Sequence, residues 1–549
     1  MTRCFKNCFQ SRAQIERNDR HSTSAAMQPP KYPSLAEFYQ GRTLFITGAT
    51  GFMGKILLEK LLRSCPEVEC IYLLMRAKRG QQPRSRLDSL LSNPIFDEVR
   101  KVRPEAFSKL RVVAGDVSED GLGLKDPELR AEVLAGVSVV FHCAACVRFD
   151  MTLKYALTFN TKGTKRVLEF CSQMEKLESL VYVSTSYCHC DRDVLGEEPY
   201  EAPFEPEKLF ECIDWLQDDL VQLITPKLIG NLPNTYAFSK SLSEKLVTDA
   251  SKIMPVAIAR PSIVTAALKE PIPGYVDNLN GPTGLLLGAG KGVLRSMHCK
   301  PAYKADLIPV DLACNGLIVI AWHLANARPE HGPLVVNLTT TERNAVSWGE
   351  IIEFGRKYIY KYPFSGVVWW PDGSIKNSKL AHDLCVIFFH TIPAYLIDCL
   401  AVLCRQKPFM VNIQKRLQGG LDLLQYYTTK EWNFTNKKIV EISEQLAQDE
   451  RECFNTDVKS VQWETYVRDM LLGTRKFILK DDNSTLPAAR RHMNRLYWLD
   501  RGFRVFVLLM FFWMLISSFG LFNFAQEEYF ASTTCEAPSE PLGVCESAV

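Results

Sequence analysis

The segment TLFITGATGFMGKILLEKLL (43–62) constrains the fold of this chain most strongly. An apolar strand is expected to enter a loop whose glycines Gly48, Gly51 and Gly54 are spaced G-x-x-G-x-x-G, and an amphipathic helix follows. Such a loop makes a tight turn, keeps Cβ atoms away from a pyrophosphate and presents the free N–H groups of a helix N-terminus to it. A turn that serves packing alone is the alternative. The flanking strand and helix favour a dinucleotide site in a doubly wound parallel sheet.

The second expected strand indicates which dinucleotide is bound. Its sequence, CIYLLM (70–75), ends at Arg76, with Lys78 and Arg79 close behind. A site for NAD usually carries Asp or Glu here to hold the ribose 2′-hydroxyl, whereas a cation suits a 2′-phosphate. The sequence therefore predicts NADPH rather than NADH, with a solvated basic loop as the alternative. In the glycine loop, the predicted cofactor contacts are Thr47, Gly48, Thr50, Gly51, Phe52, Met53 and Gly54.

The third and fourth expected strands supply further contacts with the cofactor. LRVVAGDVS leads to Asp116 and Val117, where the adenine lies in a doubly wound sheet. VSVVFHCAACV ends in small residues around Ala144, which let the backbone approach the cofactor. Its Cys143 and Cys146 form a C-x-x-C pair, but no second Cys/His pair lies at zinc-finger spacing. We interpret the two cysteines as packing residues of the strand and predict no metal site.

The residues for proton transfer are expected at the same edge of the sheet. A fifth strand, LVYVSTSY (180–187), carries Thr185 and Ser186 at its end, and NTYAFSKSLSEK begins a helix with Tyr236 and Lys240 on one face. A cationic lysine beside the phenol lowers the pKa of the tyrosine. The tyrosine can then hydrogen-bond a carbonyl and give up its proton as hydride arrives, while a hydroxyl from the strand holds the same oxygen. An ordinary helix surface is the alternative, but the order of the motifs favours carbonyl reduction.

The C-terminal region predicts attachment to a membrane. Residues 505–525 form a nearly uninterrupted apolar run without charge, long enough for a helix that crosses a bilayer. The upstream flank is rich in arginine and the downstream tail in glutamate, which predicts that the large N-terminal portion stays in the cytosol. We expect a single-pass C-terminal anchor, in the endoplasmic reticulum rather than the peroxisome.

Charge and composition argue against other classes of protein. The formal net charge is +3 and no basic block is interleaved with aromatic residues, so we predict no nucleic-acid partner. The 18 cysteines follow no repeating framework, which suits a reducing compartment. Residues 1–38 lack the apolar stretch of a signal peptide and are expected to form a mobile tail.

Taken together, the motifs resemble those of the extended short-chain dehydrogenase/reductases. The positions that carry this resemblance are 47–54, Asp116, Asn160, Thr185, Tyr236, Lys240 and 260–263. In that family the segment after the catalytic helix approaches the nicotinamide, which implies contacts from Pro261 and Ile263. More narrowly, PGYVDNLNGPTGLLLGAGKG (273–292) and ADLIPVDLACN (305–315) resemble the fatty acyl-CoA reductases of the insect type, over roughly residues 40–475.

The resemblance implies that a long-chain fatty acyl-CoA is reduced to a primary alcohol by two successive hydride transfers from NADPH. The intermediates would be a thiohemiacetal, whose oxyanion Tyr236 and Thr185 stabilise, and an aldehyde that stays bound. Ser186 is the alternative to Thr185 as the third catalytic residue. Membrane lipid is a second expected partner, and the sequence does not indicate the oligomeric state. Two other hypotheses are an extended reductase acting on a sterol or sugar nucleotide, and an inert nucleotide-binding scaffold.

A second apolar run, VIFFHTIPAYLIDCLAVLC (386–404), is interrupted by His390, Pro393 and Asp398. The run can be a helix that lines the acyl pocket, a segment that dips into the membrane, or a full span. A full span would carry the polar groups at considerable cost. His390 is expected to be a structural histidine rather than an acid or a ligand.

The expected architecture combines an α/β part with helical parts. It is a doubly wound Rossmann-type parallel sheet with a smaller substrate lobe, a mainly helical C-terminal domain and a C-terminal transmembrane helix. The expected boundaries are a mobile tail (1–38), a cofactor and substrate domain (39–370), a helical domain (371–475), a basic linker (476–504), the transmembrane helix (505–525) and a short acidic tail (526–549).

Overall fold

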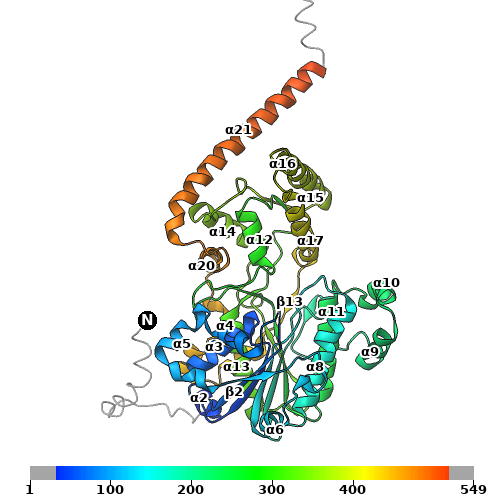
Figure 1. Ribbon diagram of the computed structural model, residues 1–549, viewed down its shortest axis with the longest axis vertical. Coiled ribbons are helices and arrows are strands. Elements are labelled where there is room, and N and C mark those ends of the chain that lie inside the picture. Colours follow the sequence, from blue (N-terminus) through cyan, green and yellow to red (C-terminus); the bar gives the residue numbers. More distant parts are fainter. Residues whose placement is uncertain (1–31, 79, 519–549) are drawn as a thin grey trace, which may run out of the picture.

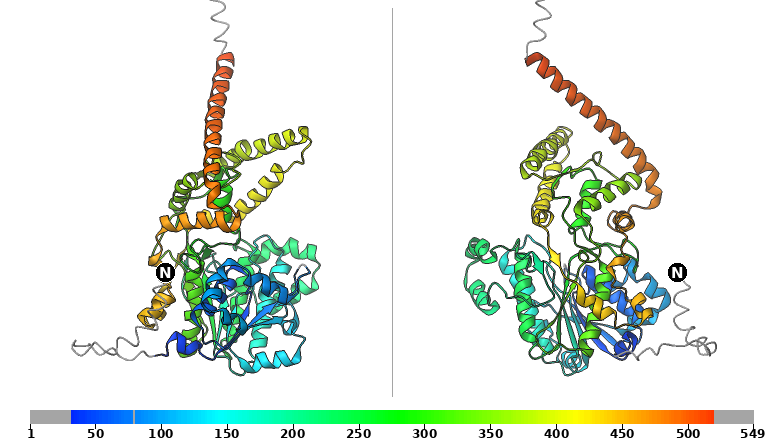
Figure 2. Two further views of the ribbon diagram at one scale, coloured as in Figure 1. Left: turned by 60° about the vertical axis from the view of Figure 1, so that its left-hand side comes forward. Right: turned by 180° about the vertical axis from the view of Figure 1, so that it is seen from behind.

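The core of the protein is a parallel sheet of seven strands. The computed structural model describes residues 32–78 and 80–518 (Figures 1 and 2). The strand order is β11-β7-β5-β4-β1-β2-β3, and every neighbouring pair runs parallel, which confirms the doubly wound α/β class. The strands are β1 (Thr43–Thr47), β2 (Cys70–Met75), β3 (Leu110–Ala114), β4 (Val137–His142), β5 (Ser179–Val183), β7 (Val256–Pro261) and β11 (Leu334–Leu338).

Helices cover both faces of this sheet. Alternate residues of β1 point to opposite sides. Leu44 and Ile46 pack with α3 and α13, whereas Phe45 packs with α8 and α11. Because both faces are buried, the strands are nearly continuous apolar runs, as is usual in parallel sheets. The helices on the two faces are α3 (Phe52–Ser64), α13 (Val310–Asn326), α6 (Pro127–Gly136), α8 (Lys162–Cys171) and α11 (Thr235–Ala250).

A smaller lobe lies over the carboxyl edge of the sheet (Figure 1). In the lobe α14 packs on α20 and α16 packs on α17, while a π-helical segment, Ile387–Thr391, joins α15 to α16. The helices of the lobe are α12 (Pro282–Gly290), α14 (Trp348–Lys361), α15 (Lys379–Val386), α16 (Ile392–Leu403), α17 (Met410–Thr428) and α20 (Trp463–Gly473). Three short parallel pairs complete the strands: β8 (Ile263–Thr265) with β10 (Leu307–Pro309), β9 (Ser296–His298) with β12 (Ser374–Lys376), and β6 (Val194–Leu195) with β13 (Asn433–Phe434).

The predicted helical domain 371–475 is mainly helical, but it is divided between the lobe and the sheet. Between α17 and α20 the chain returns to the sheet, where β13 pairs with β6 and α18 contacts α13 and β11. In α19, Glu450 accepts the backbone N–H of Leu35 at 2.6 Å. The remaining helices are α4 (Pro83–Leu91), α5 (Asp97–Val102), α7 (Leu153–Ala156), α9 (Pro206–Trp215), α10 (Asp218–Ile229), α18 (Lys437–Ser443) and α19 (Gln448–Cys453).

The expectation of a mobile tail over 1–38 is wrong for its last residues. A capping box at Ser34 begins a short helix, α2 (Leu35–Tyr39), whose apolar side chains are buried in the core. The indole N–H of Trp322 in α13 donates to the backbone just before α2 at 2.9 Å. Residues 1–31 lie outside the described part of the chain.

The predicted basic linker 476–504 is for the most part the first half of a long helix, α21 (Leu486–Ser518). Met493, Leu496 and Asp500 recur at helical spacing among the arginines and are buried against the lobe. This pattern gives the segment one buried face, which a flexible linker would not have.

The second half of α21 continues away from the lobe (Figure 2). Its large apolar side chains are exposed, Leu509 for example by 63%. The predicted transmembrane helix 505–525 is described only as far as residue 518, and the predicted tail 526–549 lies outside the described residues. Within the described chain, one helix, Lys379–Leu403, is both long and apolar enough to cross a membrane.

Candidate active site

One cavity of about 1440 Å³ lies between the carboxyl edge of the sheet and the lobe. The glycine loop, the ends of β5 and β7 and the start of α11 form one side, and residues 277–285 with α17 form the other. Tyr236, Lys240 and Thr185 line this cavity, whereas Ser186 does not. The predicted cofactor residues that line it are Gly48, Thr50, Gly51, Phe52, Met53, Gly54, Pro261 and Ile263. Those that lie outside its lining are Thr47, Arg76, Asp116, Val117 and Ala144.

Tyr236 and Lys240 lie on one face of α11, which begins at the N-cap Asn234. Lys240 is buried, and its ammonium donates to the carbonyl of Val183, the last residue of β5, at 2.7 Å. The ring of Tyr236 packs against that of Phe149 with 5.6 Å between centroids. The helix therefore presents the phenol to the cavity and holds the ammonium beneath it at the end of the strand.

The pKa of the phenol differs from the expectation. Burial raises the pKa of Tyr236 above its ordinary value, and the nearby thiols of Cys188 and Cys146 add to this shift. Burial also lowers the pKa of Lys240 to about 8. Desolvation penalises the phenolate and outweighs the expected lowering by Lys240, whose ammonium also bonds the carbonyl of Val183. Tyr236 is therefore a protonated phenol at neutral pH, which is the form that can donate a proton.

The hydroxyl groups after β5 have different surroundings. Ser186 is 1% exposed and donates to the carbonyl of Arg260 at 2.7 Å. Thr185 lines the cavity, and its oxygen accepts the backbone N–H of Tyr187 at 3.3 Å, so its own proton can be donated to an oxygen in the cavity. The geometry favours Thr185 over Ser186 as the partner of Tyr236.

The glycine loop has the shape of a phosphate cradle. Gly48 has φ +77°, and a Cβ on it would lie 2.6 Å from the backbone nitrogen of Ala144. A Cβ on Gly54 would lie 2.3 Å from the carbonyl oxygen of Gly48. Gly51 is the N-cap of α3, and the first residues of that helix line the cavity. The loop thus leaves backbone N–H groups close to the cavity, and it fits a pyrophosphate.

Thr47 and Asn160 hold the end of β4 instead of lining the cavity. The hydroxyl of Thr47 bonds the Nδ1 of His142 at 2.7 Å and accepts the N–H of Ala144 at 3.2 Å. The amide of Asn160 accepts the N–H of Cys146 at 2.8 Å and donates to a serine of α11 at 2.9 Å. Both residues therefore position the backbone between the glycine loop and α11.

Cys143 and Cys146 lie just after β4, which ends at His142, and not within the strand as expected. Both are free thiols. Burial raises the pKa of Cys143 to about 12, so that this thiol stays protonated. A protonated thiol is a poor nucleophile and metal ligand, which agrees with a packing role.

Two arginines meet beside the glycine loop. Arg76 donates to the carboxylate of Asp116 at 3.2 Å, and Arg86 of α4 donates to the carbonyl of Arg76 at 2.7 Å and to the hydroxyl of Thr50 at 3.0 Å. The pKa of Arg86 is lowered by burial and by the charge of Arg76. Two guanidinium groups held together favour a dianion such as a 2′-phosphate. The sequence carries no signal for Arg86, because this residue lies in a helix beyond the strand end; Arg79 lies outside the described residues.

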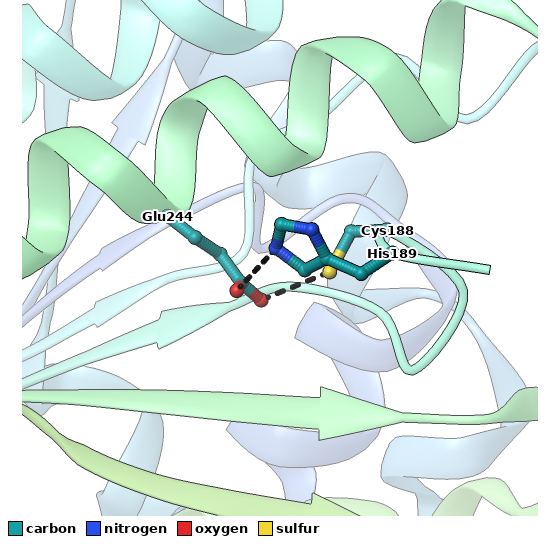
Figure 3. A group of neighbouring side chains, drawn as sticks. All are labelled: Cys188, His189 and Glu244. Carbon is teal, nitrogen blue, oxygen red and sulfur yellow. Dashed lines mark hydrogen bonds and ion pairs between the residues drawn. The ribbon is translucent and has the colours of Figure 1, made fainter. Parts of the chain in front are cut away.

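A buried charge network lies around Glu244, one turn beyond Lys240 in α11, and Figure 3 shows three of its residues. Glu244 accepts the thiol of Cys188 at 3.1 Å, and the Nε2 of His189 lies 3.4 Å from its other oxygen. In the described chain these three residues form the one group whose ligating atoms lie close enough to hold a metal ion. Both oxygens of Glu244 already accept the guanidinium of Arg260, at 2.9 and 2.6 Å. A cation here would displace that guanidinium, so we interpret the group as an ion-pair network.

The wall opposite Tyr236 and Thr185 is formed by α17. Leu417, Leu421 and Leu424 recur at helical spacing and line the cavity. At Gly419 and Gly420, between these leucines, a Cβ would meet no atom within 4 Å. The sequence does not indicate that this helix lies across the cavity from α11.

Two contacts join the lobe to the sheet at the cavity. The carboxylate of Asp277 accepts the ammonium of Lys55 in α3, and the hydroxyl of Tyr427 at the end of α17 accepts the amide of Asn234 at 3.0 Å. The DNLNGPTG segment is therefore attached to the helix that follows the glycine loop, and α17 is attached to the N-cap of α11.

Comparison with known proteins identifies the family. A family model described as "Male sterility protein" matches residues 46–317, and a second model of the same description matches residues 389–481. Fatty acyl-CoA reductase 1 of Xenopus laevis is 38% identical over 480 residues, which cover 87% of this chain and 93% of that protein. Human fatty acyl-CoA reductase 2 is 34% identical over 484 residues, 88% of this chain and 94% of that protein. The chain belongs to the fatty acyl-CoA reductase family.

Solved structures share the fold of this fatty acyl-CoA reductase. The reductase domain of a nonribosomal peptide synthetase from Mycobacterium tuberculosis aligns with a TM-score of 0.54 and 18% identity, over 82% of this chain and 94% of that one. The terminal R domain from the myxalamid PKS-NRPS pathway aligns with a TM-score of 0.52 and 20% identity, over 79% and 90%. The family match over most of the chain leaves the sterol or sugar-nucleotide alternative without support.

In this reductase the second apolar run, 386–404, does not line the cavity. It forms most of the helix from α15 to α16, whose large apolar side chains are exposed, so the interpretation as a buried helix is wrong. His390 is buried and accepts the backbone N–H of Arg295 at 2.9 Å, which confirms a structural histidine. Asp398 accepts three backbone N–H groups at the start of α17, at 2.8, 2.8 and 2.9 Å. The polar residues that interrupt the run face the protein, and the apolar residues face outward.

Proposed function

We propose that this member of the fatty acyl-CoA reductase family reduces a long-chain fatty acyl-CoA to a primary alcohol with NADPH. The observation that carries the proposal is the shared cavity. It has the glycine loop at one end, Tyr236 and Thr185 in its wall, and the leucines of α17 on the opposite side. A dinucleotide and an aliphatic chain can therefore approach one proton donor from two sides.

The residues around the glycine loop fit a nicotinamide dinucleotide, and we infer that it is NADPH. Without Cβ atoms at Gly48 and Gly54, the loop packs tightly on Ala144 and on itself, which gives the compact turn that a pyrophosphate site needs. Arg76 and Arg86 supply two cations for the 2′-phosphate, and Asp116 holds the first of them. When bound, the cofactor supplies a hydride to the carbonyl carbon.

Tyr236 and Thr185 act on the carbonyl oxygen of the thioester. Both residues belong to the lining of one cavity, and in this proposal both hydroxyl groups donate to the same oxygen. As negative charge develops there, the two donors stabilise it and Tyr236 transfers its proton. Lys240 is cationic below its pKa of about 8 and stabilises the phenolate that is left. The product of this step is a thiohemiacetal, which releases the thiol of coenzyme A and becomes an aldehyde.

The second reduction uses the same residues. The aldehyde presents its oxygen to Tyr236 and Thr185, and the leucines of α17 keep its chain in the cavity. Tyr236 must regain a proton between the two steps. One alcohol then requires two NADPH.

We also propose that the C-terminus tethers the enzyme to the endoplasmic reticulum, rather than the peroxisome, with its catalytic part in the cytosol. The proposal is supported by the exposed apolar side chains of α21 after residue 504 and by Arg501 and Arg504 just before them. Microscopy of the full chain with markers for both organelles shows in which organelle the protein lies, and protease protection of microsomes tests the topology.

The proposed reaction is tested with the full-length protein in detergent, palmitoyl-CoA and NADPH. Cofactor absorbance and gas chromatography of the lipids should show fatty alcohol at two NADPH per product. Aldehyde alone would contradict the second reduction, and no product with any acyl-CoA would contradict the proposal.

The role of Tyr236 is tested by Tyr236→Phe. We expect turnover to fall by about 10³-fold because general acid catalysis is lost. NADPH binding, followed by fluorescence, should be unchanged. Tyr360→Phe in α14, outside the cavity, is the matched control and should keep full activity. A Tyr236→Phe enzyme that makes alcohol at the wild-type rate would overturn the mechanism.

A further inference from the structure

The helix Lys379–Leu403 has two contrasting faces. Its inward face carries the buried polar residues His382, His390 and Asp398. Its outward face is a row of exposed large apolar side chains, Phe388 for example being 60% exposed. A contiguous apolar patch that is exposed to water commonly marks a site that binds a protein, a ligand or a membrane. The outward residues are Leu380, Leu384, Ile387, Phe388, Phe389, Ile392, Tyr395, Leu396, Leu400, Val402 and Leu403.

The inward residues fasten this helix to the lobe along its length. The Nδ1 of His382 pairs with the hydroxyl of Ser296 at 2.9 Å, His390 accepts a backbone N–H at 2.9 Å, and Asp398 caps α17. Between His382 and Asp398 the helix rises by about 24 Å. A helix held over that length lies along the protein surface and cannot stand across a bilayer, so only its outward face is available to lipid.

Arg295 connects this helix to α21. Its backbone N–H donates to His390, and its guanidinium pairs with Asp500 of α21 at 3.4 Å. Asp500 precedes the apolar part of α21, which starts at residue 505, by about 7.5 Å of helix. The middle of helix 379–403 therefore lies close to the level at which α21 becomes apolar, and both helices are at the same end of the molecule (Figures 1 and 2).

We propose that helix 379–403 is a second membrane contact, lying in the plane of the bilayer surface beside α21. Amphipathic helices of this kind bury their apolar face about 5–10 Å into the boundary between headgroups and acyl chains. The exposed apolar part of α21 selects a bilayer as the occupant, because both apolar surfaces then meet the same lipid.

The position of this membrane contact also suggests a path by which the acyl chain enters the cavity from the lipid. The cap at Asp398 joins the helix to α17, where Ile413 is 43% exposed and lines the cavity together with Leu417. The acyl chain thus passes from the lipid over Ile413 into the cavity. This step rests on the proposed function, whereas the membrane contact does not.

The contact is tested by photo-crosslinking of the full-length protein in vesicles of phosphatidylcholine and phosphatidylserine. The photoreactive residue benzoylphenylalanine replaces Phe388, and mass spectrometry identifies the adducts. Leu223 is the matched control, because it is 76% exposed and belongs to α10, which contacts α7 and lies outside the lobe; Phe511 in α21 is the positive control. Lipid adducts at Phe388 and Phe511 but not at Leu223 support the proposal. Adducts to a second copy of the chain at Phe388, or no lipid adduct there, overturn it.

The route is tested kinetically with the double variant Phe388→Asp, Leu396→Asp. For palmitoyl-CoA delivered in vesicles we expect the apparent KM to rise by about tenfold, since charge is expelled from the interface. Water-soluble octanoyl-CoA should be turned over at the wild-type rate, and Leu223→Asp should change neither. An unchanged KM for palmitoyl-CoA overturns the route. If no acyl-CoA is turned over, the proposed function and the route fail together, while the crosslinking result still decides the membrane contact.

Discussion

The two sides of the active-site cavity are built differently. On the cofactor side, Gly48 and Gly54 leave no room for a methyl group. On the substrate side, Gly419 and Gly420 would meet no atom within 4 Å, and α17 continues from a helix with an exposed apolar face. A cofactor of one fixed shape needs close backbone contacts, whereas an acyl chain needs only room and apolar surface. Substitutions should therefore be costly on the first side and mild on the second.

The largest effect is expected in the packed region beneath the cofactor side. Glu244→Ala leaves the charge of Arg260 buried without its partner, and we expect the free energy of unfolding to fall by roughly 3–5 kcal/mol. Urea denaturation measures this loss. Asp97→Ala removes an exposed partner of Arg100 and is the control, which should change stability little. If the free energy of unfolding falls by an equal and small amount in both variants, the Glu244 network does not contribute much to stability.

The next largest effect is expected in the glycine loop. Gly48→Ala places a methyl group against Ala144, so we expect the dissociation constant of NADPH to rise by about tenfold or more. Gly41→Ala is matched, because Gly41 also has a positive φ but has open space around it. That control should cost stability, by roughly 1–2 kcal/mol, but not cofactor affinity. Fluorescence titration and thermal unfolding separate the two quantities.

A smaller effect, on cofactor choice, is expected at the arginine pair. Arg86→Ala should reduce the preference for NADPH over NADH by about tenfold, because a charged hydrogen bond to the 2′-phosphate is lost. Arg111→Ala, which removes an exposed partner of Glu132, is the control. The measurement is kcat/KM with each cofactor. If affinity for both cofactors falls equally, Arg86 supports the fold and does not recognise the phosphate.

The smallest effect is expected on the substrate side. Gly420→Leu fills open space beside the leucines of α17, so the enzyme should prefer shorter acyl chains by a few-fold. Stability should rise by up to about 1 kcal/mol, because glycine is a poor helix former. Gly502→Leu in α21, where a Cβ also meets no atom within 4 Å, is the control for propensity alone. The measurement is the preference for acyl-chain length, obtained with competing acyl-CoA substrates. An unchanged preference would show that the acyl chain does not lie against α17.

Local patterns were enough to name most of the residues of the glycine loop and of α11 that line the cavity. The spacing of Gly48, Gly51 and Gly54 carries its own geometry, and the i, i+4 pair Tyr236 and Lys240 shares one helix face wherever that helix lies. Arg86 escaped prediction because its approach to the loop depends on how α4, the helix after β2, folds back toward Thr50. The direction of the pKa shift at the phenol was wrong for a similar reason, since it depends on burial that only tertiary packing creates.

The arrangement of the substrate side could be predicted even less, because it depends more on tertiary structure. The apolar run 386–404 has the same composition whether it is buried or exposed, and only the contacts of His390 and Asp398 show which face is inward. The predictions of a mobile tail over 1–38 and of a basic linker over 476–504 were wrong in part. In each segment a few apolar residues at helical spacing, among many polar ones, are enough to pack it on the rest of the protein.

The return of the chain to the sheet after α17 affects how this protein can be made. The strand pair β6–β13, the packing of α18 on β11, and the bond from Leu35 to Glu450 each join an early part of the chain to a late one. During synthesis, part of the apolar surface of the early segments therefore stays exposed until residues near 450 have been made and can cover it. A shortened protein that ends at residue 370 would emerge from the ribosome with those apolar faces uncovered, and we expect it to aggregate or be degraded. The natural unit for expression is the chain through the first half of α21, whose Met493 and Leu496 pack on the lobe.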